Sequence, residues 1–175
     1  KLVSQISTII LNKEQRNFSL EFPQIISPTL WSTSNPYIYQ LYIKLYQSNK
    51  LIDSINLPIG FRYFEFKENG AFYLNGERLL LRGTHWHEDY AGRGNALPDS
   101  LRVKDIQLIK DMGANFIRLA HYPQDPIIYK ACDELGLLVW DELPWCRGGM
   151  GNSHWKKNTT NLLTDQIIQN RNHPS

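Results

Sequence analysis

The sequence predicts a multidomain chain, β followed by α/β: the end of an antiparallel β-sandwich over residues 1–66, then the first units of a parallel α/β domain over residues 67–175. Three observations predict this fold class. Short aromatic and β-branched runs, punctuated by prolines, fill the first part without helical periodicity. Strand and helix patterns alternate in the second part, as in parallel sheets with right-handed crossovers. Between the two parts, Asn75-Gly76 separates apolar runs and predicts a tight hairpin.

The first part carries repeated strand signals. Tyr37–Tyr46 combines aromatic and β-branched residues with partial alternation, which suits a half-buried strand. Leu51–Ile55 and Gly60–Phe66 indicate two further strands. Because a complete sandwich of this kind has roughly 100 residues, the shorter stretch here predicts a truncated one.

The second part begins with a predicted strand and helix. Leu79–Leu81 is a short apolar run, which we interpret as a buried strand. Asp99 or Ser100 is expected to cap a helix that runs to Met112, and Gly113 is placed to end it.

Two more β-α units follow. Asn115–Leu119 is predicted as the second strand, and the uninterrupted apolar run Leu137–Trp140 as the third, since both faces of a parallel sheet are covered. Between them, Asp125 followed by Pro126 predicts a helix start, and Gly136 predicts its end. The apolar stripe of this helix comprises Ile127, Ile128, Ala131, Cys132 and Leu135. A last helix is marked by Leu162, Leu163, Ile167 and Ile168.

The composition argues against several function classes. A net charge of +2 with scattered Lys and Arg gives no footprint for nucleic acid, and no apolar run is long enough to indicate a membrane span. Cys132 and Cys146 make neither a disulfide framework nor a zinc site. Arg147–Gly151 is glycine-rich but lacks the Lys-Ser/Thr of a phosphate loop, so no cofactor is expected. We interpret this segment as a mobile loop over the site mouth, with His154 and Trp155 as lid residues.

Polar and aromatic side chains follow each of the three predicted strands, and the carboxyl ends of parallel strands lie at one edge of a sheet. We therefore expect a functional site there. Its candidate residues are His87 after the first strand, Arg118 and His121 at the second, and Asp141, Glu142 and Trp145 after the third.

Structural interpretations of these residues stay open. His87 could be an ordinary loop residue, and His121 could only shape a turn with Tyr122 and Pro123. Arg118 must be paired because it lies on an otherwise apolar strand, and the pair could be purely structural. Asp141 and Glu142 could cap or pair structurally, and tryptophans are more often core residues than sugar platforms. A metal site is not expected, since His85-x-His87 with Glu88 and Asp89 has no second cluster at zinc-like spacing.

Several motifs resemble glycoside hydrolase family 2, the β-galactosidase/β-glucuronidase family, and occur in that family's order. Those of the sandwich are Leu30–Ser32 and Asn35–Tyr37. Those of the catalytic barrel are Leu74–Arg78, Leu81–Gly83, His87-Glu88, Met112–Arg118, Ala120–Pro123, Cys132–Leu137, Trp140–Glu142 and Arg171–Ser175. The resemblance implies a partial immunoglobulin-like β-sandwich followed by the first three βα units of a (β/α)8 TIM barrel.

The resemblance further implies a retaining glycosidase that uses two glutamates, one as nucleophile and one as acid/base. Both are expected beyond Ser175, so no catalytic residue is assigned within this chain. The implied supporting residues are His87 in the substrate pocket, Arg118 near the catalytic carboxylates, His121 on sugar hydroxyls, and Asp141 in a structural role. Where some members carry Glu-x-His for magnesium, this sequence has Leu143–Gly148, so no magnesium is expected there.

The expected ligand is a carbohydrate of β-galactoside or β-glucuronide type, and the alternative is a non-catalytic carbohydrate-binding or structural module derived from such an enzyme. The 175-residue piece alone is expected to be inactive. Three strands leave an apolar edge exposed, so we expect the molecule to continue or the piece to associate, including with a copy of itself. Cytoplasm, periplasm and cell exterior all remain open.

Overall fold

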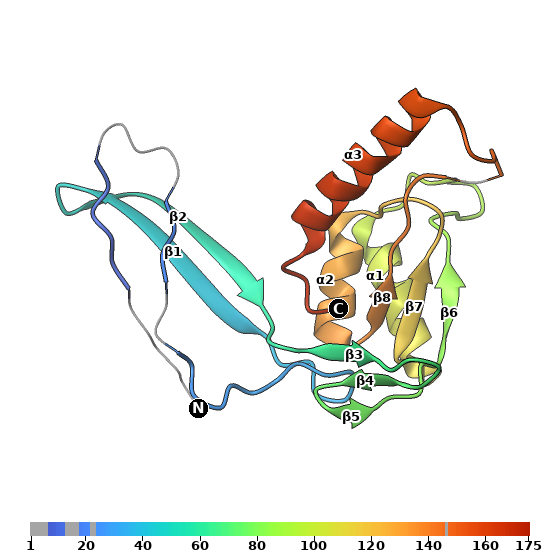
Figure 1. Cartoon of the computed structure of the whole chain (residues 1–175), viewed down its shortest axis with the longest axis horizontal. Helices are drawn as coiled ribbons and strands as arrows, with labels where there is room; N and C mark the ends of the chain where they lie inside the picture. Colours follow the sequence, from blue (N-terminus) through green and yellow to red (C-terminus); the bar gives the residue numbers. More distant parts are fainter. Residues whose placement is uncertain (1–6, 13–17, 22–23, 146) are drawn as a thin grey trace.

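The computed structural model describes residues 7–12, 18–21, 24–145 and 147–175. Cys146 lies outside the described residues, as do parts of the first 23 positions. Figure 1 shows a long hairpin at one side and a mixed α/β body at the other. Among the described residues no helix combines the length and apolar character that a bilayer crossing needs.

The hairpin consists of β1 (Tyr39–Gln47) and β2 (Lys50–Ile59), which pair antiparallel. The prediction of a strand near residues 37–46 is therefore confirmed. The bounds predicted for the next two strands, Leu51–Ile55 and Gly60–Phe66, were wrong. β2 continues to Ile59, and the next strand, β3 (Phe64–Phe66), begins only after a non-strand segment. Many apolar side chains of the hairpin are exposed, including Tyr42, Tyr46 and Ile52.

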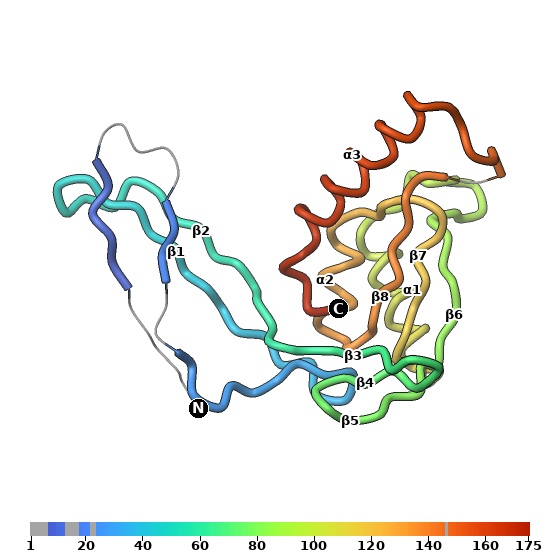
Figure 2. The backbone as a smooth tube through the Cα atoms, in the orientation of Figure 1, coloured from blue at the N-terminus to red at the C-terminus, as the bar shows by residue number. Residues whose placement is uncertain are grey.

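A small sheet lies under the body and links it to the hairpin (Figure 2). It contains β3, β4 (Phe72–Leu74) and β5 (Glu77–Arg78), in that order. The predicted tight turn is confirmed, since Leu74 pairs with Glu77 across Asn75 and Gly76, whose φ angles are 54° and 83°. Positive φ at both central positions is what this kind of hairpin turn requires.

The body is a parallel sheet with helices packed on one face. Its strands are β6 (Gly83–Trp86), β7 (Phe116–Leu119) and β8 (Leu138–Trp140), adjacent in that order. Helices α1 (Asp99–Asp111) and α2 (Pro126–Leu135) follow the first two strands, and α3 (Ser153–Asn170) follows the third. The prediction of alternating strands and helices in this part is confirmed.

The first strand of this sheet lies later in the sequence than predicted. Leu79–Leu81 is not a strand: Leu80 is exposed, while Leu79 and Leu81 pack against the buried cluster of Trp31, Leu74 and Leu138. The pairing of β6 with β7 begins at Gly83, where the two backbones lie so close that any side chain would collide with the Phe116 carbonyl. Only glycine permits this approach of the two backbones.

The predicted helix starts were correct for α2 and wrong for α1 and α3. α2 has the predicted signals, with the Asp125 carboxylate accepting from the Ile127 N–H over 3.0 Å and Gly136 in the left-handed conformation at its end. For α1, Asp99 is already the first helical residue and Pro98 is the N-cap, without a side-chain cap bond, so the predicted Asp or Ser cap was wrong. His154 and Trp155 were also wrongly placed in a loop, because α3 begins at Ser153 with Asn152 as its side-chain cap.

The core lies between the parallel sheet and helices α1 and α2. Its largest fully buried members are Ile106, Ile117, Leu119, Ile128, Leu137 and Cys132. Burial raises the pKa of the Cys132 thiol, which keeps it protonated and unreactive. The other face of the parallel sheet is more exposed to solvent. α3 buries none of its residues, and Trp140 of β8 is 58% exposed.

Candidate functional site

The site lies where the three parallel strands end. In the register of the sheet, His85, Arg118 and Trp140 lie in one row across β6, β7 and β8. Strand alternation places the neighbouring Ile117 and Leu119 in the core against the helices. Arg118 therefore occupies the face of β7 that points away from α1 and α2, which explains how an apolar strand carries a charge.

Arg118 forms a two-pronged ion pair with Glu142. Its Nε donates to Glu142 Oε1 over 2.6 Å and its Nη2 donates to Oε2 over 3.1 Å. The Trp140 indole N–H also donates to Oε1 of Glu142, over 3.2 Å. Glu142 is thus held by groups from β7 and β8, with its side chain 19% exposed.

His121 completes this cluster. Its Nδ1 lies 2.9 Å from Glu142 Oε2 and 3.2 Å from Arg118 Nη2. A guanidinium can only donate and an ionised carboxylate can only accept, so the shorter contact assigns the Nδ1 proton to the bond with Glu142. The Nε2 atom of a neutral His121 ring is then an acceptor.

The charge of Glu142 follows from these contacts. Hydrogen bonds from Arg118 and His121 hold the pKa of the Glu142 carboxyl below its usual range, against the opposing effect of burial. Hydrogen bonds to the charged form and a nearby cation both favour ionisation. Glu142 is therefore a fixed anion rather than a proton donor.

This pairing predicts a pH dependence of stability. A carboxyl whose folded pKa is depressed stabilises the fold above its unfolded pKa, and the contribution is lost as pH falls towards the folded value. We expect the difference in melting temperature between the wild type and Glu142→Gln to be constant above about pH 5 and to shrink below about pH 4. Thermal melts from pH 7 to pH 3 measure it, and a difference independent of pH would contradict the assignment.

His87 joins the cluster through ring contacts rather than hydrogen bonds. Its ring centroid lies 5.1 Å from that of His121, in an edge-to-face arrangement, and 5.9 Å from that of His85. The Tyr122 ring lies 6.5 Å away. His87 and His85 are both exposed, so their rings border open space beside the Arg118–Glu142 pair.

Asp141 faces the other way. Its Oδ2 accepts from the Tyr129 hydroxyl over 2.9 Å and from Asn170 Nδ2 over 3.3 Å. Its Oδ1 accepts from the backbone N–H of Glu142 over 3.1 Å. Asp141 thus ties α2 and α3 to the chain at Glu142.

Tyr129 was not singled out by the sequence, yet it positions Asp141. Its hydroxyl also accepts from the buried Gln124 N–H over 3.0 Å. We expect Tyr129→Phe to destabilise the protein by about 1–2 kcal/mol, because one buried N–H loses its acceptor and Asp141 loses a donor. Denaturant melts measure this, with Tyr42→Phe on the exposed hairpin as a control that should stay neutral. Equal stability of the two variants would contradict the role of Tyr129.

Two residues near the strand ends stand outside the cluster. The Trp145 indole N–H donates to the Gly149 carbonyl within its own loop over 3.0 Å, so the structure does not join Trp145 to the other five candidates. Glu88 turns inward and pairs with Arg102 of α1, both side chains being nearly buried. Glu88 therefore does not face His85 and His87. Within the described ranges no group of three or more potential metal ligands occurs.

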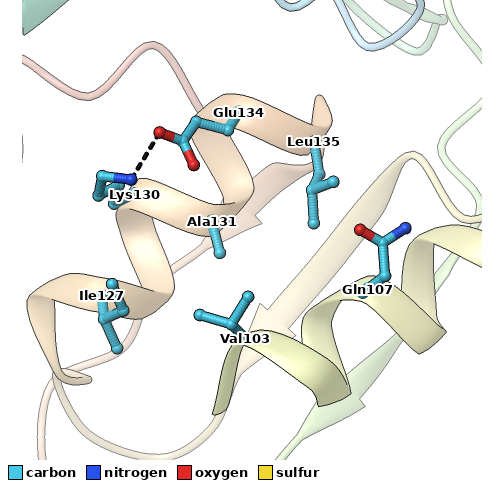
Figure 3. A pocket seen from close by; sticks show the side chains of 7 residues that line it. All are labelled: Val103, Gln107, Ile127, Lys130, Ala131, Glu134 and Leu135. Carbon is cyan, nitrogen blue, oxygen red and sulfur yellow. Dashed lines mark hydrogen bonds and ion pairs between the residues drawn. The ribbon is translucent and has the colours of Figure 1, made fainter. Parts of the chain in front are cut away.

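The two hollows described on the surface lie elsewhere. One separates α1 from α2 and is lined by Val103, Gln107, Ile127, Lys130, Ala131, Glu134 and Leu135 (Figure 3). The other lies between the hairpin and the end of α2. Neither includes a candidate residue. The Arg118 side chain is 42% exposed and that of His121 is 31% exposed, so the cluster borders solvent.

Family models match both parts of the chain. The family model described as "Glycosyl hydrolases family 2, TIM barrel domain" matches residues 64–175, and the model described as "Glycosyl hydrolases family 2" matches residues 3–62.

Individual relatives carry glycosidase names. A protein of Formosa agariphila, provisionally named a β-glucuronidase, is 62% identical over 156 residues, covering 89% of this chain and 19% of its own length. A β-galactosidase of Thermoanaerobacter pseudethanolicus is 36% identical, covering 93% of this chain and 22% of its own. The structure of β-glucuronidase 3 from Bacteroides uniformis superposes with a TM-score of 0.83 at 51% identity, covering 90% of this chain and 20% of that one. The chain thus spans about a fifth of the length of the proteins it matches.

Proposed function

Because the chain belongs to glycosyl hydrolase family 2, we propose that the whole protein is a retaining β-glycosidase and that this chain supplies one wall of its sugar site. Residues 1–66 would be the end of the sandwich domain, and residues 67–175 the first three βα units of the barrel. The observation that carries the proposal is the meeting of His87, Arg118, His121 and Glu142 at the carboxyl ends of parallel strands. That edge is where barrel enzymes place their active sites.

The two catalytic glutamates are assigned to sequence beyond Ser175. Glu142 is unsuited to be the general acid, since a general acid needs a raised pKa and that of Glu142 is lowered. Asp141 is tied to α2 and α3 by its hydrogen bonds. The 175 residues alone are therefore proposed to be inactive.

The residues of this chain would bind and orient the sugar. His121, with its Nδ1–H directed at Glu142, presents Nε2 as an acceptor for a sugar hydroxyl. His87 offers an exposed ring beside it. Arg118 provides a positive charge at the rim that favours the ionised form of nearby carboxyls.

We propose β-glucuronides as the leading substrates, ahead of β-galactosides. The support is the order of similarity, because the relatives at 62% and 51% identity carry the β-glucuronidase name and the β-galactosidase is 36% identical.

The test uses the full-length protein and a panel of nitrophenyl β-glycosides. Hydrolysis of the β-glucuronide is expected, and NMR of the first-formed product should show the β anomer, as retention requires. Hydrolysis of the β-galactoside alone would correct the sugar, and an initial α anomer would exclude retention. Absence of hydrolysis throughout would favour a non-catalytic carbohydrate-binding module.

A further inference from the structure

Asp133 is a buried carboxylate that the proposed chemistry does not use. It lies near the end of α2 and is 3% exposed. Its Oδ2 lies 2.5 Å from His173 Nδ1, and its Oδ1 accepts from the backbone N–H of Ser175 over 3.0 Å. A buried carboxylate needs such partners to offset the loss of water, so Asp133 and the segment 173–175 hold each other in place.

The segment that Asp133 holds lies alongside the parallel sheet. The Val139 N–H of β8 donates to the Ser175 carbonyl over 2.8 Å, which is the kind of bond that a strand next to β8 would make. Pro174 is buried and packs against Gly60, where a side chain would collide with the proline ring. Residues 173–175 are thus fixed on one side by Asp133 and on the other by the link to the sandwich.

Asp133 also connects to the sandwich part directly. The indole N–H of Trp31, a fully buried residue, donates to the Asp133 carbonyl over 2.8 Å. Arg62 donates to the Pro174 carbonyl and interacts electrostatically with Asp133. One residue of α2 therefore joins both parts of the chain to the residues beside β8.

We propose that Asp133 is a positioning residue for the general acid/base glutamate of the whole enzyme. The inference rests on the proposed function, which assigns that glutamate to the sequence beyond Ser175. By holding His173 and the Ser175 N–H, Asp133 sets the height and register at which the strand beside β8 begins. The proposal takes this strand to carry the acid/base, so a displacement of its first residues would also displace that glutamate.

The experiment compares leaving groups in the full-length protein. A dinitrophenol needs little protonation to leave, whereas a phenol needs the general acid. For Asp133→Asn we expect kcat/KM for phenyl β-glucuronide to fall about 30-fold or more, within the range that small misplacements produce. The value for dinitrophenyl β-glucuronide should fall less than about threefold, because its glycosidic bond breaks without proton transfer.

The matched control is Glu134→Gln, which removes the same charge from the next residue. Glu134 is exposed and pairs only along the helix surface with Lys130 among the described contacts, so both kcat/KM values should stay within about twofold. A second pair covers the case in which Asp133→Asn does not fold. His173→Ala should reproduce the leaving-group difference, and His173→Asn should restore activity, since an amide nitrogen can replace Nδ1.

The outcomes separate this inference from the proposed function. If the wild type cleaves neither glucuronide nor any other aryl glycoside, the proposed function fails and the inference fails with it. If the wild type is active and Asp133→Asn, or its substitute His173→Ala, loses activity equally on both leaving groups, Asp133 is only structural. A comparable leaving-group difference in Glu134→Gln would overturn the inference as well.

Discussion

Arg118→Ala in the full-length protein is expected to lower kcat/KM by about two orders of magnitude while the fold remains intact. Arg118 donates two hydrogen bonds to Glu142, and without it Glu142 keeps only the contacts with Trp140 and His121 and loses the arginine charge that balances it. A second negative charge raises the pKa of neighbouring carboxyls, and the nucleophile must be ionised to react. The acid limb of the kcat/KM profile should therefore move to higher pH.

Two variants make this result specific. Arg118→Lys keeps the charge but cannot make the two-pronged contact, so an intermediate loss of about tenfold is expected. Arg78→Ala removes an exposed arginine from β5 in the small sheet and should leave kcat/KM unchanged. Near-normal turnover in Arg118→Ala, or an unshifted acid limb, would remove Arg118 from the site.

Gly83→Ala is expected to destabilise the protein by about 3 kcal/mol, or to prevent its folding. A Cβ at this position would lie 1.8 Å from the Phe116 carbonyl oxygen, and backbone atoms of a paired strand cannot move aside as a side chain could. The start of β6 would have to separate from β7. Because His87 directly follows β6, the displacement would also reach the site.

The matched control for this substitution is Gly148→Ala. Among the described residues, a Cβ there would have only the Trp145 indole nitrogen as a neighbour, at 4.0 Å, so the stability of this variant should change by less than about 0.5 kcal/mol. Urea melts and soluble yield compare the two variants. If Gly83→Ala and Gly148→Ala unfold at the same urea concentration, the close approach of β6 and β7 does not exclude a side chain at residue 83.

Residue types at single positions were enough to predict one turn and the two ends of one helix. The Asn75-Gly76 turn and the limits of α2 required only backbone conformations that a few residue types favour. The first strand of the parallel sheet required more. Leu79–Leu81 has the apolar run of a strand, but where the ladder starts depends on the contact between Gly83 and Phe116, which sequence periodicity does not encode.

The sequence predicted which residues lie at the edge of the sheet, but not the residues that support them. The order of strands predicted His87, Arg118 and His121 at one edge, and in the structure His121 contacts both of the others. The supporting residues were not predictable, because Tyr129 and Asp133 lie within a helix whose apolar stripe dominates the pattern. Their partners, Asp141 and Ser175, are distant in sequence. Trp145 was selected by residue type alone, and its indole bonds within its own loop.

The most direct test is a crystal structure of the full-length protein with glucuronate bound. A ring hydroxyl is expected within about 3 Å of His121 Nε2, with the His87 ring against the sugar and the Arg118–Glu142 pair beneath it. A sugar bound at another face, or a site in which these side chains turn into packing among themselves, would contradict a role for this chain in glycoside binding.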